Sequence, residues 1–545
     1  MVSSPQSVVY SSRMRPTSNW LVAGLLVWMF LACCYPLYDT DLFWHLKTGE
    51  WILQNGSIPG YDLYTYTDPD NRWIDRHWGF QIVAATLYRI GGADLLVLVK
   101  TTILTLALGI GSYAGGAKLT GCQRVLCWLL PAITISGRGY ERPEIVSLVC
   151  LATWLAIVAR LESRPRWIWI LPAIQVFWIN FHALYILGLT VGACYSLDYV
   201  VRCLANNRWG LGSVPQGVTP SMLIRAGALC VVAALVNPYF EEGALFPLIL
   251  MRKFTTDQNL YITIGEFQPP VMFLLKHGFI NLYLNAEILL WLTAAVSFVE
   301  LAVRGQFSVF RTVLFAAFSY LAWQASRNTN IFSIVAGFVM AENISEMSTR
   351  TRDDHSTADS SLVPWLRRSL GLLLAMMIVA VVTGEWNRWG ERIRPFRLGE
   401  ARAWFPHDAA RFLGRGGYPQ RVFGAVFNMA AVYTYHNGPE GKVFMDGRLE
   451  VCSKEIYERY CQITGRMKVA HPAWTELLRS QDGSLPAVML DSRYSRDLIE
   501  GVMNTPGWRL VYADQAAAVF FDNDTADRLR LPAVSFGPLQ VPSQL

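Results

Sequence analysis

Charged side chains are scarce in this chain. They make up 16% of its 545 residues, while apolar residues make up 53%. A typical soluble protein carries about 25% charged residues, so the composition excludes a disordered protein and favours a membrane protein. Long Lys and Arg runs are also absent, and the net charge is only +6. Nucleic acid is therefore not expected as a partner.

Cysteine motifs are missing as well. No CxxC pair or Cys/His metal spacing occurs among the ten cysteines, which excludes a zinc site of the usual kind. Most of them fall in or beside apolar runs and are predicted to be buried free thiols: Cys33, Cys34, Cys122, Cys127, Cys150, Cys194, Cys203 and Cys230. Only Cys452 and Cys461 share a polar region, and whether they pair stays open at the sequence level.

Long apolar runs are what the chain has in abundance. A helix needs about 20 mostly apolar residues to cross a bilayer. The sequence predicts about eleven spans, at 20–38, 93–116, 125–136, 145–159, 167–179, 183–201, 222–236, 284–303, 309–325, 331–341 and 366–383. The first run is long and lacks a small-x-small cleavage site, so it is predicted to be a retained span.

Basic residues are concentrated in alternate loops between these runs. Arg124, Arg160, Arg202 and Arg311 all fall in loops of one side. Because short cytoplasmic loops are enriched in Lys and Arg, that side is predicted to be cytoplasmic. The sequence therefore predicts a cytoplasmic tail at 1–18, a transmembrane domain at 19–385 and an extracytoplasmic domain at 386–545, in a plasma or inner membrane.

Two long segments are expected on the opposite side. The loop 39–92 is far longer than a usual connection and is predicted to hold interfacial helices at 42–54 and 78–90. The tail alternates predicted strands with predicted helices, which is typical of an α/β domain. The strands are expected at 422–425, 442–445, 487–490, 509–512 and 517–521, and the helices at 407–414, 454–464, 472–478 and 496–503. A polar flexible loop is expected at 349–359.

Two carboxylates follow the first span directly. Asp39 and Asp41 stand at the membrane boundary, where a carboxylate can act as a base or hold a divalent cation. The alternative is that these acids end a span and cap the next helix. His45 lies one helical turn beyond Asp41, either as part of a site or as an interfacial side chain.

Two arginines lie on the same predicted outer side, against the usual distribution of charge. Arg138 and Arg142 could bind phosphate oxygens in bidentate fashion. The alternative for Arg142 is an ion pair with Glu141 or Glu144. Glu266 lies in a proline-containing outer segment, either as a site residue or as an ordinary surface acid.

Further polar residues interrupt apolar runs on this side. Arg327 and Asn328 form a second outer basic site, and His182 breaks an apolar hairpin where polar groups are costly. Asp446 and Arg448 follow a predicted strand and are possible acceptor contacts, with an Asp–Arg pair in a turn as the alternative.

Together these loops bring acids, arginines and an imidazole to one side of the membrane. Ionisable groups at membrane depth indicate a functional site. A carboxylate base beside arginines suits a phosphate-bearing, membrane-dissolved substrate and an incoming hydroxyl, with the arginines stabilising the leaving phosphate.

The chain resembles the C-fold (GT-C) glycosyltransferases, and more closely a group of bacterial multi-span proteins assigned to that superfamily. The shared stretches are Asp39-Thr-Asp-Leu-Phe-Trp-His-Leu-Lys-Thr-Gly49, Arg142-Pro-Glu, Trp178-Ile-Asn-Phe-His182, Asn237-Pro-Tyr, Glu266-Phe-Gln-Pro-Pro270, Arg327-Asn and Phe444-Met-Asp-Gly-Arg448. They extend over nearly the whole chain.

The resemblance implies transfer of a sugar from a polyprenyl-phosphate donor to a glycan, lipid or protein acceptor at the outer membrane face. Asp41 or Asp39 would match the first-loop carboxylate of the superfamily, which acts as a base or orients the acceptor. Some members use a divalent cation such as Mg²⁺ or Mn²⁺ there, so Asp39 and Asp41 are the expected ligands if there is one. A transporter of lipid-linked glycans and a non-catalytic assembly factor remain alternatives, although a transporter is expected to show paired halves, and the sequence has no internal repeat.

Overall fold

The structure is a computed structural model. It describes residues 19–535 except for 70, 117, 206–213, 216, 257–263, 355–361, 390–394 and 481. The predicted tail 1–18 and the 355–359 part of the predicted polar loop lie outside the described residues.

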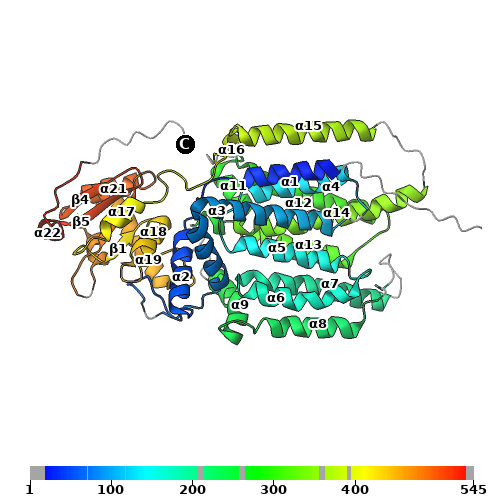
Figure 1. Cartoon of the computed structure of the whole chain (residues 1–545), viewed down its shortest axis with the longest axis horizontal. Helices are drawn as coiled ribbons and strands as arrows, with labels where there is room; N and C mark the ends of the chain where they lie inside the picture. Colours follow the sequence, from blue (N-terminus) through cyan, green and yellow to red (C-terminus); the bar gives the residue numbers. More distant parts are fainter. Residues whose placement is uncertain are drawn as a thin grey trace, which may run out of the picture.

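Long helices run side by side in a bundle, and a smaller α/β unit covers one end of it (Figure 1). The bundle helices are α1 (Asn19–Cys33), α3 (Trp78–Ala114), α4 (Gly121–Ser136), α5 (Glu144–Val158), α6 (Leu171–Ile179), α7 (Ile186–Ala205), α8 (Pro220–Ala233), α12 (Leu282–Val303), α13 (Val309–Gln324), α14 (Thr329–Asp354) and α15 (Leu362–Val382). Short helices lie at the end near the α/β unit or between the long ones: α2 (Leu42–Asn55), α9 (Phe240–Thr256), α11 (Pro270–His277), α16 (Glu385–Trp389), η1 (Pro165–Ile170), η2 (Ala183–Tyr185), η4 (Gly265–Phe267) and η5 (Ser326–Asn328).

Among the described residues, five stretches of helix are long and apolar enough to cross a membrane: Trp78–Ala114, Ala183–Ala205, Leu282–Val303, Ser326–Ser348 and Pro364–Val382. Three shorter apolar helices accompany them, namely Asn19–Cys33, Glu144–Val158 and Pro220–Ala233. These lengths do not test the predicted count of eleven spans, which stays a prediction.

Several element boundaries differ from those the sequence predicted. The first helix ends at Cys33 rather than near residue 38, so residues 34–41 form a connection that leads into α2. The short predicted span at 331–341 is part of the 26-residue helix α14. Helix α9 was not predicted, because Glu241, Glu242 and Pro247 interrupt its apolar pattern.

Helix α3 contains both the predicted second interfacial helix and the second predicted span. A kink at Gly91 and Gly92 separates the two parts. Gly92 has φ of 60° and ψ of −153°, a conformation that essentially only glycine adopts. The glycine pair therefore lets the chain turn from the end of the bundle into its interior.

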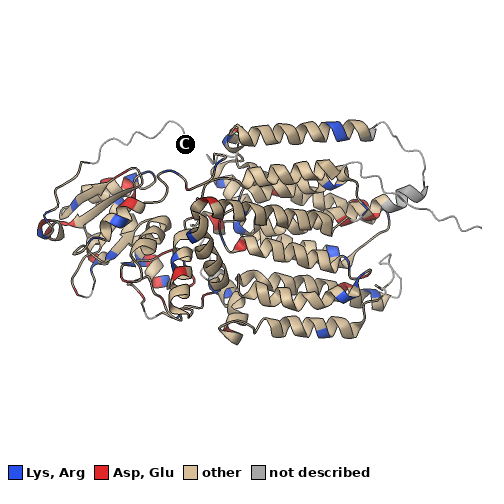
Figure 2. Ribbon diagram, viewed as in Figure 1, with Lys and Arg blue, Asp and Glu red and all other residues tan. Residues whose placement is uncertain are grey.

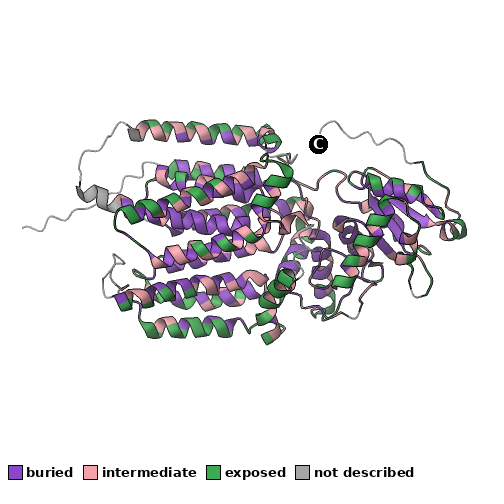
Figure 3. Cartoon of the chain, turned by 180° about the vertical axis from the view of Figure 1, so that it is seen from behind, coloured by how far each residue is buried: buried purple, intermediate pink, exposed green. Residues whose placement is uncertain are grey.

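Burial within the bundle depends on where a helix lies: the inner helices are mostly buried, and the outer helices are more exposed (Figure 3). Outer helices expose large apolar side chains, such as Ile224 of α8 at 71% and Leu372 of α15 at 62%. A water-soluble protein rarely exposes such extended apolar surface. These faces therefore suit contact with lipid tails.

Arginines sit at the end of the bundle away from the α/β unit, where α3 ends and α4 begins (Figure 2). Arg124 donates to the carbonyls of Gly115 and Gly116 at 3.2 and 3.0 Å. Arg160 donates to the carbonyl of Ala156 at 3.0 Å. Cations are favourable at helix carboxyl ends, so these contacts both terminate the helices and concentrate positive charge on one side.

The tail forms a five-stranded mixed sheet with helices around it. Strand order is β2-β1-β3-β5-β4, with β2, β1 and β3 parallel and β5 antiparallel to both β3 and β4. The strands are β1 (Arg421–Gly424), β2 (Lys442–Val443), β3 (Ala487–Asp491), β4 (Trp508–Ala513) and β5 (Ala517–Asp522). The helices are α17 (His407–Leu413), α18 (Phe427–Asn437), α19 (Lys454–Lys468), α20 (Ala473–Leu478), α21 (Arg496–Met503) and α22 (Asn523–Arg528). All five predicted strands and all four predicted helices are present, whereas α18 and α22 were not predicted.

The first outer loop is joined to this sheet. Val443 of β2 donates its N–H to Tyr64 and accepts from the N–H of Tyr66, at 2.8 and 3.0 Å. Phe43 of α2 packs in one apolar cluster with Phe405 and Val432 of the tail. The tail is therefore held against the end of the bundle through the first loop.

All ten cysteines lie within the described residues and are free thiols, Cys452 and Cys461 included. Cys203 is exposed, which corrects the prediction of a buried thiol. It lies near the end of α7.

Candidate active site

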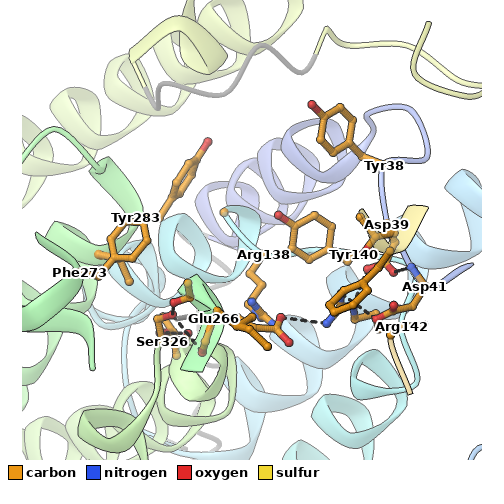
Figure 4. A pocket seen from close by; sticks show the side chains of 18 of the residues that line it. Tyr38, Asp39, Asp41, Arg138, Tyr140, Arg142, Glu266, Phe273, Tyr283 and Ser326 are labelled. Carbon is orange, nitrogen blue, oxygen red and sulfur yellow. Dashed lines mark hydrogen bonds and ion pairs between the residues drawn. The ribbon is translucent and has the colours of Figure 1, made fainter. Parts of the chain in front are cut away.

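A cavity of about 420 Å³ lies where the bundle meets the tail (Figure 4). The connection before α2, the connection between α4 and α5, and the segment around Glu266 supply its polar side chains. The start of α12, η5 and three separate stretches of the tail complete its wall. Residues far apart in the sequence thus share one cavity.

Arg142 lies at the centre of a cluster of three carboxylates. Its Nε donates to Asp39 Oδ2 at 2.5 Å and its Nη1 to Glu266 Oε2 at 3.0 Å, and its Nη2 forms an ion pair with Asp41 Oδ2 at 3.0 Å. Burial alone lowers the pKa of the arginine, but the three carboxylates raise it well above its usual value. The guanidinium is therefore permanently charged. Its predicted alternative partners, Glu141 and Glu144, pair with other groups instead.

Arg138 shares one of these carboxylates. It donates through Nη2 to Glu266 Oε2 at 2.9 Å, and its Nε lies 3.8 Å from Glu144 Oε2. Burial raises the pKa of Glu266, but the surrounding guanidiniums of Arg142, Arg138 and Arg327 lower it below its usual value. Glu266 is thus ionised and is not an ordinary surface acid.

Asp39 and Asp41 occupy different environments. Asp39 is fully engaged, because Oδ1 accepts from the Asp41 N–H at 2.7 Å while Oδ2 binds Arg142. Asp41 precedes α2 but makes no side-chain cap, and its Oδ1 is buried with no hydrogen-bond partner among the described residues. Burial raises the pKa of Asp41 to about 7, although Arg142 opposes that change. Helix capping therefore does not account for Asp41.

Arg327 and Asn328 lie in η5, next to the cavity-lining residues Ser326 and Thr329. Within the described part of the chain Arg327 has no ion pair, and its guanidinium lies 4.9 Å from the centre of the Phe267 ring. Its charge nevertheless helps to lower the pKa of Glu266. Asn328 donates to the Leu321 carbonyl at 2.8 Å and thereby holds the turn.

The two predicted histidines lie outside the cavity. His45 is 3% exposed and contacts Gln81 at 3.4 Å, and His182 is 8% exposed and contacts Ser147 at 2.8 Å. Burial lowers the pKa of both rings well below the usual value. Neither ring lines the cavity, although Arg142 adds to the lowering of the pKa of His45 and Arg327 to that of His182. The rings lie instead on either side of His77, in a separate buried row.

Asp446 and Arg448 also lie outside the cavity. Arg448 donates to Asp446 and to Asp62 of the first loop, both at 2.7 Å, and its side chain is completely buried. The structure thus forms the Asp–Arg pair of the alternative interpretation. This buried triad joins the tail to the first loop.

Gly447, between these two residues, does line the cavity. A Cβ atom added to it would lie 2.0 Å from Asp41 Oδ1. The backbone at Gly447 therefore packs directly on the carboxylate. The glycine lies in a motif recognised in the sequence, but its contact with Asp41 has no local signature.

Aromatic residues also line the cavity and were not predicted as site residues. Tyr38 stacks on Trp404 of the tail with ring centroids 3.8 Å apart. Phe427, also from the tail, lines the cavity as well. Tyr140 and Tyr283 lie on the bundle side (Figure 4). Since 20 Trp, 23 Tyr and 27 Phe occur in the chain, nothing local singles these residues out.

A divalent cation has little room among these carboxylates. Each of the three that converge already directs one oxygen at a nitrogen of Arg142. Among the described residues no group of three or more His, Cys, Asp or Glu side chains is arranged to hold a metal ion. The donor set therefore does not fit a bound cation with Arg142 in place.

No protein-family model matches this sequence, and no curated protein matches it. Solved structures do match. The apo oligosaccharyltransferase of Archaeoglobus fulgidus is 10% identical, with 93% of this chain and 75% of that chain covered and a TM-score of 0.56. The archaeal oligosaccharyltransferase AglB from Archaeoglobus fulgidus, in complex with an inhibitory peptide and a dolichol-phosphate, is 11% identical, with 92% and 74% covered and a TM-score of 0.54. Apo ArnT from Cupriavidus metallidurans is 13% identical, with 92% and 97% covered and a TM-score of 0.50.

These neighbours are glycosyltransferases of the GT-C fold. At such low identity the likeness establishes the fold and not the activity. The chain thus has the GT-C fold over most of its length, in agreement with the resemblance seen in its motifs.

Proposed function

We propose that the protein is an integral-membrane glycosyltransferase that moves a sugar from a polyprenyl-phosphate donor to a hydroxyl-bearing acceptor. The GT-C fold supports this proposal, and one structural neighbour binds a dolichol-phosphate. The observation that carries it is the buried, unpartnered Oδ1 of Asp41 at a cavity that also contains arginines. A pKa near neutrality suits a carboxylate that must accept a proton at cellular pH.

Asp41 is the base in this proposal, and Asp39 positions it. The acceptor oxygen forms a bond to the anomeric carbon while its proton passes to Asp41. The bond between that carbon and the phosphate oxygen breaks, and the phosphate leaves with the electron pair. Asp39 cannot take the base role as readily, because both of its oxygens are already occupied.

The donor phosphate is assigned to Arg327 and Arg138. Arg327 has no ion pair in the described residues, and Arg138 shares its carboxylate Glu266 with Arg142 and lies 3.8 Å from Glu144. Guanidinium groups bind phosphate oxygens well. They would stabilise the negative charge that develops on the leaving phosphate.

The tail supplies the acceptor side of the cavity. Trp404, Phe427 and Gly447 all come from it. Aromatic rings offer flat apolar surface with little loss of side-chain entropy. A glycan, a lipid headgroup or a peptide could occupy this side, and the proposal covers all three as acceptors.

We further propose that the bundle crosses a plasma or inner membrane about eleven times, with residues 1–18 in the cytoplasm and the tail from residue 386 outside. The arginines at the end away from the tail support this orientation through the positive-inside rule. Reporter fusions after α15 and after α13 test it. A tail reporter active in the cytosol contradicts the orientation.

The function is tested with purified full-length protein in nanodiscs. Radiolabelled undecaprenyl-phosphate hexoses and pentoses serve as donors with membrane extract as acceptor, and the release of undecaprenyl phosphate is measured because it forms whatever the acceptor is. We expect Asp41→Asn to lower that release about 10²- to 10⁴-fold, the usual contribution of a general base.

Asp408→Asn is the matched control, because Asp408 is an exposed carboxylate in the tail that pairs with Arg411 alone. It should leave the rate unchanged. Unchanged release in Asp41→Asn removes Asp41 as the base. Absence of release from every donor by the unaltered protein contradicts the glycosyltransferase proposal and favours a transporter or an assembly factor.

A further inference from the structure

The carboxylate cluster of the cavity has an internal cation. Three carboxylates from two separate segments converge on one point, and that point is occupied by the guanidinium of Arg142. Each nitrogen of the guanidinium faces a different carboxylate. Such a set of converging oxygens is what Mg²⁺ and Mn²⁺ otherwise take from a protein.

The oxygens that remain do not form a second set. Asp39 Oδ1 accepts from the Asp41 N–H, and Asp41 Oδ1 is pressed against Gly447. A metal ion would need oxygens at about 2.0–2.2 Å in a regular geometry. With Arg142 in place, no two free carboxylate oxygens of the aspartates point to a common centre.

The position of Arg142 is also restricted by its neighbours in the sequence. It directly precedes Pro143, which stands at the start of α5, and its guanidinium lies 5.8 Å from the centre of the Tyr140 ring. Movement of the guanidinium away from the cluster would leave Asp39 and Asp41 without a counter-ion, and Glu266 would keep only Arg138. Like charges at such distances repel strongly in a partly buried site.

We propose that Arg142 takes the place of a divalent cation in this carboxylate cluster, so that the site binds no metal and sugar transfer proceeds without one. The statement about metal binding stands independently, and the statement about transfer rests on the proposed function. Arg142 is a positioning residue in this scheme, because it pairs with Asp41 Oδ2 and so fixes the orientation of the Asp41 carboxylate.

The test uses Mn²⁺ as the probe and the full-length protein in nanodiscs after treatment with EDTA. Electron paramagnetic resonance of free Mn²⁺ measures how much of the ion binds. We expect no stoichiometric binding by the unaltered protein at micromolar Mn²⁺. Arg142→Ala vacates the cluster and should bind about one Mn²⁺ per chain, and adding Glu266→Gln to that variant should weaken binding at least about tenfold.

Arg327→Ala is the matched control, because it removes a nearby guanidinium that is not within the cluster. It should bind no Mn²⁺. Equal gains in Arg142→Ala and Arg327→Ala would mean that net charge, not occupancy, decides binding, which overturns the proposal. Binding of one Mn²⁺ per chain by the unaltered protein also overturns the proposal, if Asp39→Asn abolishes that binding. This last measurement tests the proposal even where Arg142→Ala does not fold.

The transfer reaction gives a second readout. Release of undecaprenyl phosphate should be the same within about twofold in EDTA and in millimolar Mn²⁺. A loss of about tenfold or more in EDTA, restored by Mn²⁺, overturns metal-independent transfer. If no donor is cleaved at all, the proposed function fails, and the Mn²⁺ binding measurements still decide whether Arg142 fills the metal position.

Discussion

The contact between Gly447 and Asp41 gives the sharpest prediction. Gly447→Ala places a methyl group 2.0 Å from Asp41 Oδ1, whereas carbon and oxygen atoms in real structures stay more than 3.0 Å apart. One of the two partners must therefore move by about 1 Å, since folded interiors have few voids to absorb the methyl group. The question is which partner gives way.

The contacts that hold Gly447 and Asp41 in place indicate which of the two residues moves. The Gly447 segment is held by the buried triad of Asp62, Asp446 and Arg448, and breaking such a buried pair costs about 3–5 kcal/mol. Asp41 is held by one ion pair to Arg142, whose side chain is 20% exposed. Asp41 should therefore move, at an overpacking cost of about 1–3 kcal/mol.

We expect Gly447→Ala to lower the release of undecaprenyl phosphate about 10- to 100-fold, because a displacement of about 1 Å can cost that much in rate. The melting temperature should fall by only a few degrees. Gly465→Ala is the control: Gly465 lies in α19 of the same domain, and an added Cβ meets nothing within 4 Å. It should retain the rate and gain up to about 1 kcal/mol of helix stability. An unchanged rate and melting temperature in Gly447→Ala would refute the packing of the tail on Asp41.

Three further predictions follow from the same geometry. The transfer rate should fall about tenfold per pH unit below about pH 7, because the raised pKa of Asp41 leaves the base protonated there; a flat profile from pH 5 to 8, measured at saturating donor, contradicts this role. Arg448→Met should destabilise the protein by about 3–5 kcal/mol in thermal unfolding, because Asp62 and Asp446 are left buried without a counter-ion. The control Arg421→Met removes an exposed pair with Asp482 and should cost less than about 1 kcal/mol. Equal losses of stability in the two variants would show that the triad does not anchor the tail. Arg327→Ala should raise the KM for the donor about tenfold or more with no loss of melting temperature, because Arg327 has no ion pair to lose in the described residues; an unchanged KM removes it from the phosphate site.

The fold was largely predictable from local patterns. Apolar runs located nearly all of the bundle helices, and short strand-like runs between helical ones in the tail located the five strands. The predicted helix boundaries were wrong where something other than the apolar run determines where the helix ends. The first run continues to Tyr38 in composition, yet its helix ends at Cys33, because Pro36 cannot continue the helix and Leu37 pairs with Glu400 of the tail. Helix α18 was missed because it is buried on nearly all sides and shows no amphipathic pattern.

The candidate site was predictable in part. Asp39, Asp41, Arg138, Arg142 and Glu266 are unusual because they are ionisable residues between apolar runs, and the structure brings them together at one cavity. His45 and His182 carry the same signal, and Asp446 and Arg448 follow a predicted strand, but the structure places all four outside the cavity. An ionisable residue at membrane depth must find a partner, and sequence cannot tell a catalytic cavity from a buried structural pair.

The sequence by itself determined that the chain forms a bundle of apolar helices with an α/β tail and places ionisable groups at one end, because composition and periodicity are local properties. Only the tertiary structure decided which of those groups meet. The carboxylates of Asp39, Asp41 and Glu266 meet around Arg142, and the tail packs Gly447 on Asp41, because contacts between distant segments depend on the packing of the whole chain.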